Sequence, residues 1–237
     1  QIACVVMGNS FHCEEDPLDV NTSHRILCYG DSNTARIGAG GRHIVSYGRS
    51  LEKHLRQRGF DVQVEVNGNS GMTAKALYER RCEKFILDFA NTLHPGLECR
   101  LDCMPDTPDL VIIMLGTNDI GVHANELNAF EYVKKLHNVC HERGIKTIAL
   151  AATTAASIHC PTNVKKSRDE LAKIIEEYDM VTDNVLGQMD PGQIVDRHPA
   201  FWERDQLHWS DRGHDYFGEQ LADVVERALD IIESPPW

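Results

Sequence analysis

The chain has 237 residues, of which 24 are Lys or Arg and 36 are Asp or Glu, so its formal net charge is −12 with the histidines neutral. This acidic balance argues against binding to nucleic acid or to an anionic membrane, because both rely on a basic surface. The composition, 42% hydrophobic and 25% charged, is typical of a globular protein. The most apolar run, residues 110–115, is far shorter than the roughly 20 residues of a membrane span. We therefore expect a soluble protein.

The N-terminal residues 1–7 are apolar, but no basic residue precedes them and no clear cleavage site follows, so a signal peptide is not expected. Of the eight cysteines, Cys28 and Cys140 lie in apolar periodic segments, where a reduced thiol packs as a small hydrophobic side chain. This predicts a reducing, cytoplasmic location. Cys99 and Cys103 have the spacing of half a zinc site, but a second Cys/His pair with convincing spacing is missing, so no metal is expected.

In chain order, strand-length apolar runs alternate with amphipathic ones, which predicts a parallel sheet whose strands are joined by crossover helices. The strands are expected at residues 26–29, 62–66, 109–116, 146–152 and 193–196, the last being the weakest. The helices are expected at residues 47–58, 126–143, 165–178 and 216–232. The run 109–116 is apolar throughout, as is typical of a central strand that is buried on both faces.

Neither a repeat nor a linker divides the sequence, so we expect one domain over residues 1–237, with residues 1–24 as an N-terminal extension. The longest irregular stretches are 8–24, 88–108 and 197–213, and stretches of this length are often functional. Ligands of an open α/β sheet bind beyond the carboxyl ends of its strands. Candidate functional residues should therefore be sought where the strands end.

Polar motifs follow three of the predicted strands, and a fourth lies near the C-terminus. They are Gly30-Asp31-Ser32-Asn33, Asn67-Gly68-Asn69-Ser70-Gly71, Gly116-Thr117-Asn118-Asp119 and Asp205-Gln206-Leu207-His208. Each motif alone is typical of a turn or a helix cap. Together they contain the nucleophile, the base, the carboxylate and the oxyanion donors that acyl transfer needs.

This ordered set of motifs, from Arg25 to about Val225, resembles the SGNH hydrolase superfamily of GDSL-type esterases and lipases. Residues 25–32 and 109–119 are most similar to its arylesterase and acyltransferase branch. The resemblance implies a flavodoxin-like, three-layer α/β/α fold with a central, mostly parallel sheet. It also implies a triad of Ser32, Asp205 and His208, an oxyanion hole formed by Ser32, Gly71 and Asn118, and no cofactor.

Elementary chemistry supports these roles. A serine hydroxyl is a weak nucleophile until a base removes its proton, and histidine, whose unperturbed pKa is about 6.5, suits that task. Asp205, three positions before His208, can hold the other ring nitrogen and stabilise the imidazolium. The backbone N–H groups of Ser32 and Gly71 and the side-chain amide of Asn118 can donate to the oxyanion.

Several other polar residues are expected to be structural. Asp31 and Asp119 should organise loops by accepting backbone hydrogen bonds. His137 and His141 lie one helical turn apart, but the sequence around them does not complete a metalloprotease motif, so we expect a solvated helix face.

A second Asp-x-x-His pair, Asp211 and His214, repeats the spacing of Asp205 and His208. Spacing therefore does not separate the two pairs. The resemblance favours the earlier pair, and we expect His214 to pack at the start of the last helix.

Substrate specificity is expected to lie in residues 90–107 and 199–202, and we expect Asn33, Trp202 and Trp209 to contact the substrate. The expected activity is hydrolysis of short-chain aryl or alkyl carboxylic esters through an acyl-enzyme, with acyl transfer to alcohols as a further outcome. A carbohydrate O-deacetylase, a binding protein without turnover and a phosphodiesterase or nuclease are the alternatives. The expected partner is a small-molecule ester rather than nucleic acid, and a homo-oligomer would be compatible with the arylesterase branch.

Overall fold

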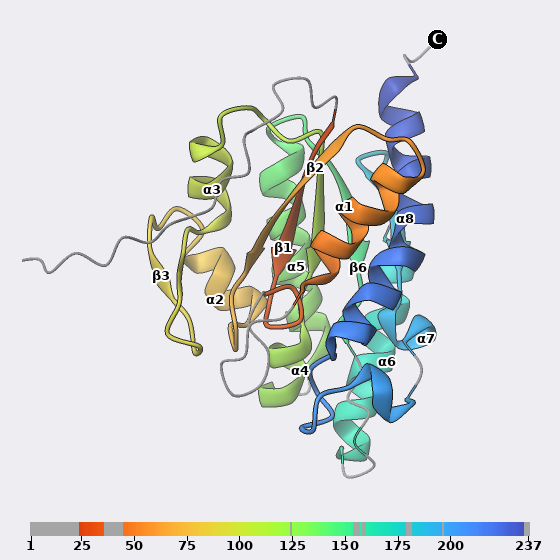
Figure 1. The fold of residues 1–237 in the computed structure, drawn as a ribbon. Helices are drawn as coiled ribbons and strands as arrows, with labels where there is room; N and C mark the ends of the chain where they lie inside the picture. The colour runs from red at the N-terminus through yellow and green to blue at the C-terminus, as the bar shows by residue number, and fades with distance from the viewer. Residues whose placement is uncertain are drawn as a thin grey trace, which may run out of the picture.

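The computed structural model describes residues 24–35, 45–123, 125–153, 157, 160–178, 182–195 and 197–234 (Figure 1). Its centre is a five-stranded sheet in the order β2-β1-β5-β6-β7, in which every neighbouring pair is parallel. The strands are β1 (His24–Gly30), β2 (Val62–Gly68), β5 (Leu110–Met114), β6 (Lys146–Leu150) and β7 (Val185–Met189). This is the strand order of a flavodoxin-like sheet, with β5 in the centre as predicted.

Helices cover both faces of the sheet, which confirms the predicted three-layer α/β/α fold (Figure 1). One face is covered by α1 (Tyr47–Gln57) and α8 (Asp211–Glu233), which pack against each other. The other face is covered by α3 (Leu97–Cys103), α5 (Glu126–His141) and α6 (Thr162–Glu176). Shorter elements complete the described chain: α2 (Ala74–Glu79), α4 (Thr117–His123), α7 (Pro191–Ile194), a 3₁₀ turn (Pro199–Phe201) and the antiparallel pair β3 (Ile86–Leu87) and β4 (Leu93–His94).

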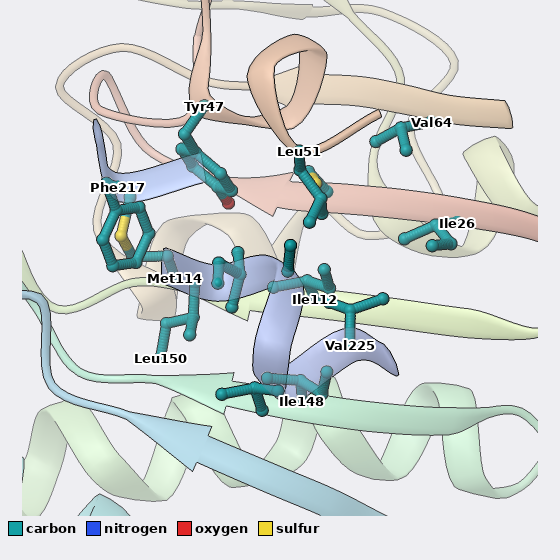
Figure 2. Packing of buried hydrophobic residues seen from close by; sticks show 14 of the residues in the cluster. Ile26, Tyr47, Leu51, Val64, Ile112, Met114, Ile148, Leu150, Phe217 and Val225 are labelled. Carbon is teal, nitrogen blue, oxygen red and sulfur yellow. The ribbon is translucent and has the colours of Figure 1, made fainter. Parts of the chain in front are cut away.

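Side chains of the central strands alternate between the two layers. Ile112 and Met114 of β5 pack with Tyr47 and Phe217 beneath α1 and α8 (Figure 2), whereas Ile113 faces the opposite layer. Burial on both faces explains why the β5 sequence is apolar throughout. The sheet is thus held from both sides, and its strand ends are fixed relative to one another.

Most predicted boundaries differ from the structure by one to three residues, and two differences are larger. The strand predicted at 193–196 is wrong, because α7 forms there instead. The Asp190 carboxylate caps this helix by accepting the Gly192 N–H at 2.8 Å, and Pro191 fits its first turn. Asp196 lies outside the described residues. The fifth strand is β7. The last helix begins at Asp211 rather than at residue 216, because the Ser210 hydroxyl caps it by accepting the N–H of Gly213.

The stretch 88–108, predicted to be irregular, contains β4 and α3. The N-terminal extension expected at residues 1–24 lies outside the described residues, apart from His24, which begins β1. Cys28 and Cys140 are buried, as their apolar surroundings predicted. In the part of the chain that the structure describes, no helix is both long and apolar enough to cross a bilayer.

Candidate active site

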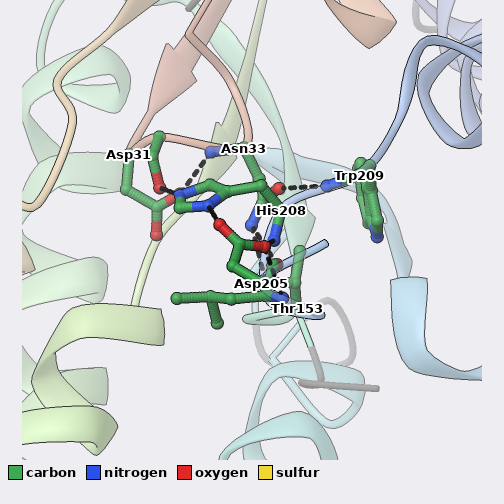
Figure 3. A network of polar contacts seen from close by, with 8 residues as sticks. Asp31, Asn33, Thr153, Asp205, His208 and Trp209 are labelled. Carbon is green, nitrogen blue, oxygen red and sulfur yellow. Dashed lines mark hydrogen bonds and ion pairs between the residues drawn. The ribbon is translucent and has the colours of Figure 1, made fainter. Parts of the chain in front are cut away.

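Three polar side chains from distant segments meet beyond the carboxyl end of β1. Ser32 lies in the turn after β1, and Asp205 and His208 lie in the loop before α8 (Figure 3). His208 Nε2 is 2.9 Å from Ser32 Oγ, and His208 Nδ1 is 2.7 Å from Asp205 Oδ2. A continuous chain of hydrogen bonds therefore runs from carboxylate through imidazole to hydroxyl, the arrangement that can activate a serine nucleophile.

The two oxygens of the Asp205 carboxylate have different partners. Oδ1 accepts the backbone N–H groups of Leu207 and His208, both at 3.0 Å, which leaves Oδ2 for the His208 ring. Partial burial alone would raise the pKa of Asp205, but the hydrogen bonds from the ring and from these two N–H groups outweigh it, so the pKa is lowered. Asp205 is therefore an anion that can orient the imidazole and stabilise its charged form.

The loop that carries Asp205 and His208 is a short hairpin closed by an antiparallel bridge between Trp202 and Trp209. Inside the bridge, the Glu203 N–H donates to the His208 carbonyl at 2.8 Å and the Gln206 N–H donates to the Glu203 carbonyl at 3.0 Å. These backbone hydrogen bonds hold the loop in a tight turn. The spacing between Asp205 and His208 is thus fixed by the backbone.

Asn33, the residue after Ser32, connects this loop to the end of β1 (Figure 3). Its Oδ1 accepts the Trp209 N–H at 3.2 Å, and its Nδ2 donates to the Leu207 carbonyl at 3.4 Å. The Asn33 side chain is fully buried. It therefore holds the backbone on both sides of His208, which argues against the substrate contact expected for it from the sequence.

Trp202 and Trp209, for which substrate contact was predicted, both lie in a hydrophobic cluster. Both belong to the hydrophobic core beneath α1 and α8, and Trp209, only 1% exposed, packs edge-on to Tyr47 and tilted against Phe217. Trp209 therefore has almost no surface left for a ligand, whereas Trp202, at 7%, is about as exposed as Ser32. We assign both tryptophans to anchoring the Asp205 and His208 loop.

The other two sequence motifs converge on the same edge of the sheet. The Asn69 N–H donates to the Gly30 carbonyl at 2.8 Å, which brings the segment after β2 beside the Ser32 turn. The Asn118 Nδ2 donates to the Met72 carbonyl at 2.9 Å and so fixes the Asn118 amide next to Gly71. Gly71 has φ +72°, a conformation that favours glycine. Three potential oxyanion donors are therefore grouped around the end of β1.

The two acidic residues expected to be structural accept backbone hydrogen bonds. Asp119 Oδ2 accepts the Ala74 N–H at 2.9 Å and thereby ties α4 to the start of α2. Asp31 Oδ1 accepts the Asn33 N–H at 3.1 Å. Burial raises the pKa of both carboxyls, to about 6 for Asp31.

The second Asp-x-x-His pair is separated from this site by burial. His214 is fully buried at the start of α8, where its Nδ1 accepts the Tyr47 N–H at 3.2 Å, and burial lowers its pKa to about 3.

His137 is also fully buried rather than on a solvated face, which corrects the sequence prediction. Its Nδ1 is 2.8 Å from Thr147 Oγ1, and His141 Nε2 is 2.9 Å from the same oxygen.

Thr153 is a site residue that the sequence analysis missed. It follows β6, and its Oγ1 accepts a hydrogen bond from Asn33 Nδ2 at 2.9 Å (Figure 3). The same oxygen lies 3.3 Å from Thr117 Oγ1. Thr117 directly precedes Asn118. The position of Thr153 after β6 could have identified it, because β6 is an inner strand of the sheet and its carboxyl end lies at the same edge as that of β1.

Cys99 and Cys103 lie on α3 with their sulfur atoms 3.9 Å apart. Among the described residues, no group of three or more His, Cys, Asp or Glu side chains could hold a metal ion.

Comparisons with known proteins agree with this geometry. The family model described as GDSL-like Lipase/Acylhydrolase matches residues 28–216. No curated protein sequence matches the chain.

Solved structures with the same fold include a carbohydrate acetylesterase family member from Sinorhizobium meliloti (20% identity, TM-score 0.67, 87% of this chain and 99% of that chain). They also include an inhibitor-bound aryl esterase of M. smegmatis (21% identity, TM-score 0.64, 86% and 99%). A third is a family 3 carbohydrate esterase of Clostridium thermocellum (17% identity, TM-score 0.61, 88% and 96%).

Proposed function

The chain belongs to the GDSL-like lipase/acylhydrolase family and is a carboxylic ester hydrolase, and from this premise we propose that it cleaves short-chain aryl or alkyl esters through an acyl-enzyme on Ser32. The observation that carries the proposal is the hydrogen-bond chain from Asp205 through His208 to Ser32, with distances of 2.7 and 2.9 Å. These distances allow a proton to pass from the hydroxyl to the imidazole during attack.

In the proposed reaction, His208 Nε2 takes the Ser32 proton as Oγ attacks the ester carbonyl carbon. The resulting oxyanion is stabilised by the N–H groups of Ser32 and Gly71 and by the Asn118 amide. His208 then returns the proton to the leaving alkoxide, the C–O bond breaks, and the alcohol departs. Water attacks the acyl-serine in the same manner and releases the acid; an alcohol in place of water would give a transferred ester.

Labelling tests the nucleophile directly. An organophosphonate should add its mass to the peptide that contains Ser32, and Ser32→Ala should abolish both the labelling and aryl acetate hydrolysis. Mass spectrometry of the digested protein locates the adduct. A label on a different serine would contradict the assignment.

The two histidines provide a matched pair of variants for the base. His208→Ala should lower kcat by at least about a thousandfold, because the base is lost. His214→Ala should act on stability instead, since it removes a buried acceptor of the Tyr47 N–H; we expect a loss of about 2 kcal/mol in the free energy of unfolding. An active His208 variant beside an inactive but folded His214 variant would reverse the assignment.

Carbohydrate O-deacetylation is the second candidate, because proteins with this fold include the Sinorhizobium meliloti and Clostridium thermocellum carbohydrate esterases. The same triad would serve that reaction, so the substrate distinguishes the two. A panel of aryl acetates, acetylated monosaccharides and acetylated xylan, assayed with and without an alcohol acceptor, separates arylesterase, deacetylase and acyltransferase activity.

A further inference from the structure

An exposed aromatic ring lies against Gly71. Phe89 is 80% exposed, yet a Cβ atom placed on Gly71 would lie 2.7 to 2.9 Å from three atoms of the Phe89 side chain. The side chain thus covers the Cα of Gly71 on one side and meets solvent on the other. We propose that Phe89 is a specificity-determining residue that packs against the apolar group of the ester, an inference that rests on the proposed function.

The backbone of Phe89 is fixed relative to Gly71 by reciprocal hydrogen bonds. The Phe89 N–H donates to the Ser70 carbonyl at 3.1 Å, and the Ser70 N–H donates to Asp88 Oδ2 at 2.9 Å. The other carboxylate oxygen of this buried aspartate accepts the N–H groups of Ala90 and Thr92, at 3.0 and 2.9 Å, and so orders the turn between β3 and β4. The backbone that carries the ring is therefore held beside Gly71 before any ligand arrives.

The ring is also within reach of a bound ester. A substrate carbonyl oxygen that accepts a hydrogen bond from the Gly71 N–H lies one hydrogen bond away from the Gly71 backbone, and the Phe89 ring lies against that same residue. The path from this oxygen to the ring is therefore at most about 9 Å. A modest alkyl or aryl group on the ester spans that distance. Phe89 is thus placed to contact the substrate without contacting the reacting atoms.

The hairpin that carries Phe89 has further exposed apolar side chains. Leu87 and Leu93, which face each other in β3 and β4, are both more than half exposed. An apolar ester group that covers this surface removes apolar area of both partners from water, which is favourable. The surface therefore fits an apolar aryl or alkyl group of the ester.

Two ester series that share methyl acetate test this inference. One series extends the acid from acetate to octanoate as methyl esters, and the other extends the alcohol of an acetate ester from methanol to 1-octanol, so that the reactivity of the leaving group stays nearly constant. For the wild-type chain, kcat/KM should rise with apolar size along at least one series. In Phe89→Ala that rise should shrink, with about a five- to tenfold loss for the largest ester and the smallest loss for methyl acetate. The affected series identifies the side of the ester that contacts the ring.

Phe85→Ala is the matched control. Phe85 is 62% exposed on the same hairpin, but its ring centroid lies 5.6 Å from Lys84 Nζ, whereas the atoms nearest to Gly71 belong to Phe89. This variant should show the wild-type dependence on ester size, and Phe89→Leu should retain part of it. A rise that persists in Phe89→Ala, or that Phe85→Ala removes equally, would overturn the inference. A wild-type chain that neither hydrolyses methyl acetate nor takes the phosphonate label would instead contradict the proposed function.

Discussion

Asp31 is a fully buried carboxyl one residue before the proposed nucleophile. Burial raises its pKa from 3.8 to about 6, although the hydrogen bond from the Asn33 N–H acts in the opposite direction. At neutral pH the folded chain therefore contains a buried anion that is unfavourable for stability. Local destabilisation beside reacting groups is a common property of enzyme sites.

Asp31→Asn should stabilise the chain at alkaline pH. Because the folded pKa is above the unfolded one, the stabilising contribution of Asp31 is present at low pH and is lost as the pH rises through about 6. An asparagine oxygen can still accept the Asn33 N–H, so the free energy of unfolding at pH 8 should rise by up to about 3 kcal/mol. Urea unfolding at pH 8 and pH 4.5 measures this gain, which should be smaller at pH 4.5. An equal change at both pH values would contradict the titration of Asp31.

For individual residues, the sequence predicts the polar motifs of the site better than the packing of the side chains around them. The triad candidates and the oxyanion candidates could be predicted because each motif follows a strand and a family pattern orders them. Spacing could not separate His208 from His214, because their difference lies in burial, and the burial of His214 depends on how α8 packs against α1. The same cause explains why the burial of Trp209 could not be predicted, because an apolar ring could equally have lined a pocket.

Among the elements, β6 connects the two halves of the site. Thr153, just after this strand, bonds to Asn33, which holds the His208 loop, and approaches Thr117, which precedes Asn118. One hydroxyl thus links the base to an oxyanion donor candidate. We infer that Thr153 is a positioning residue that acts through these neighbours.

Thr153→Val removes this hydroxyl at nearly constant volume. We expect kcat to fall about tenfold with little change in KM, because the orientation of reacting groups is impaired rather than substrate binding. Steady-state kinetics measure the split, and Thr153→Ser should restore kcat. Thr147→Val is the control on the same strand, since Thr147 bonds to His137 and His141 instead. It should lower stability but not kcat, and a similar loss of kcat in both variants would indicate a general structural effect.

The elements that the sequence missed are short or lie at the sheet edge. Helices α2 and α4 have six and seven residues, too few for a helical apolar period to be recognised. Strand β7 pairs only with β6 in the described sheet, and it contains Gly187. A Cβ atom there would lie 2.7 Å from Val224 of α8, so the close approach of that helix explains the glycine that obscured the strand pattern.

For the molecule as a whole, two buried histidines contribute to the response to acid. Burial lowers the pKa of His137 and of His214 from 6.5 to about 3. Below about pH 6.5 the unfolded chain binds protons at these positions that the folded chain does not. Their contribution to stability is therefore complete above that pH and is lost progressively as the pH falls toward 3.

His137→Gln should flatten this acid dependence. Each such histidine contributes a slope of about 1.4 kcal/mol per pH unit between its folded and unfolded pKa values, and glutamine contributes none. Urea unfolding between pH 6 and pH 4 should therefore give a slope lower by about that amount, whatever the effect of the substitution at pH 7. A slope equal to that of the wild-type chain would show that His137 does not titrate as inferred.

The overall architecture was the most predictable property. A parallel sheet with crossover helices follows from the alternation of apolar and amphipathic runs, the family resemblance implied the three-layer α/β/α arrangement, and the apolar run of β5 identified the central strand. The burial of His137 could not be predicted, because a histidine pair one helical turn apart was expected on a solvated face. It depends on the neighbouring Thr147 of β6 and on Tyr178, which no local pattern encodes.

Ser32, Asp205 and His208 lie in turns, whereas the hydrophobic clusters that hold the layers together consist of other residues. The reaction can therefore be switched off while the scaffold stays intact. Ser32→Ala would then yield a folded receptor that retains esters without consuming them. When this variant is immobilised and exposed to a mixture of metabolites, it should bind the natural ester and retain it. Mass spectrometry of the bound fraction would then identify that ester.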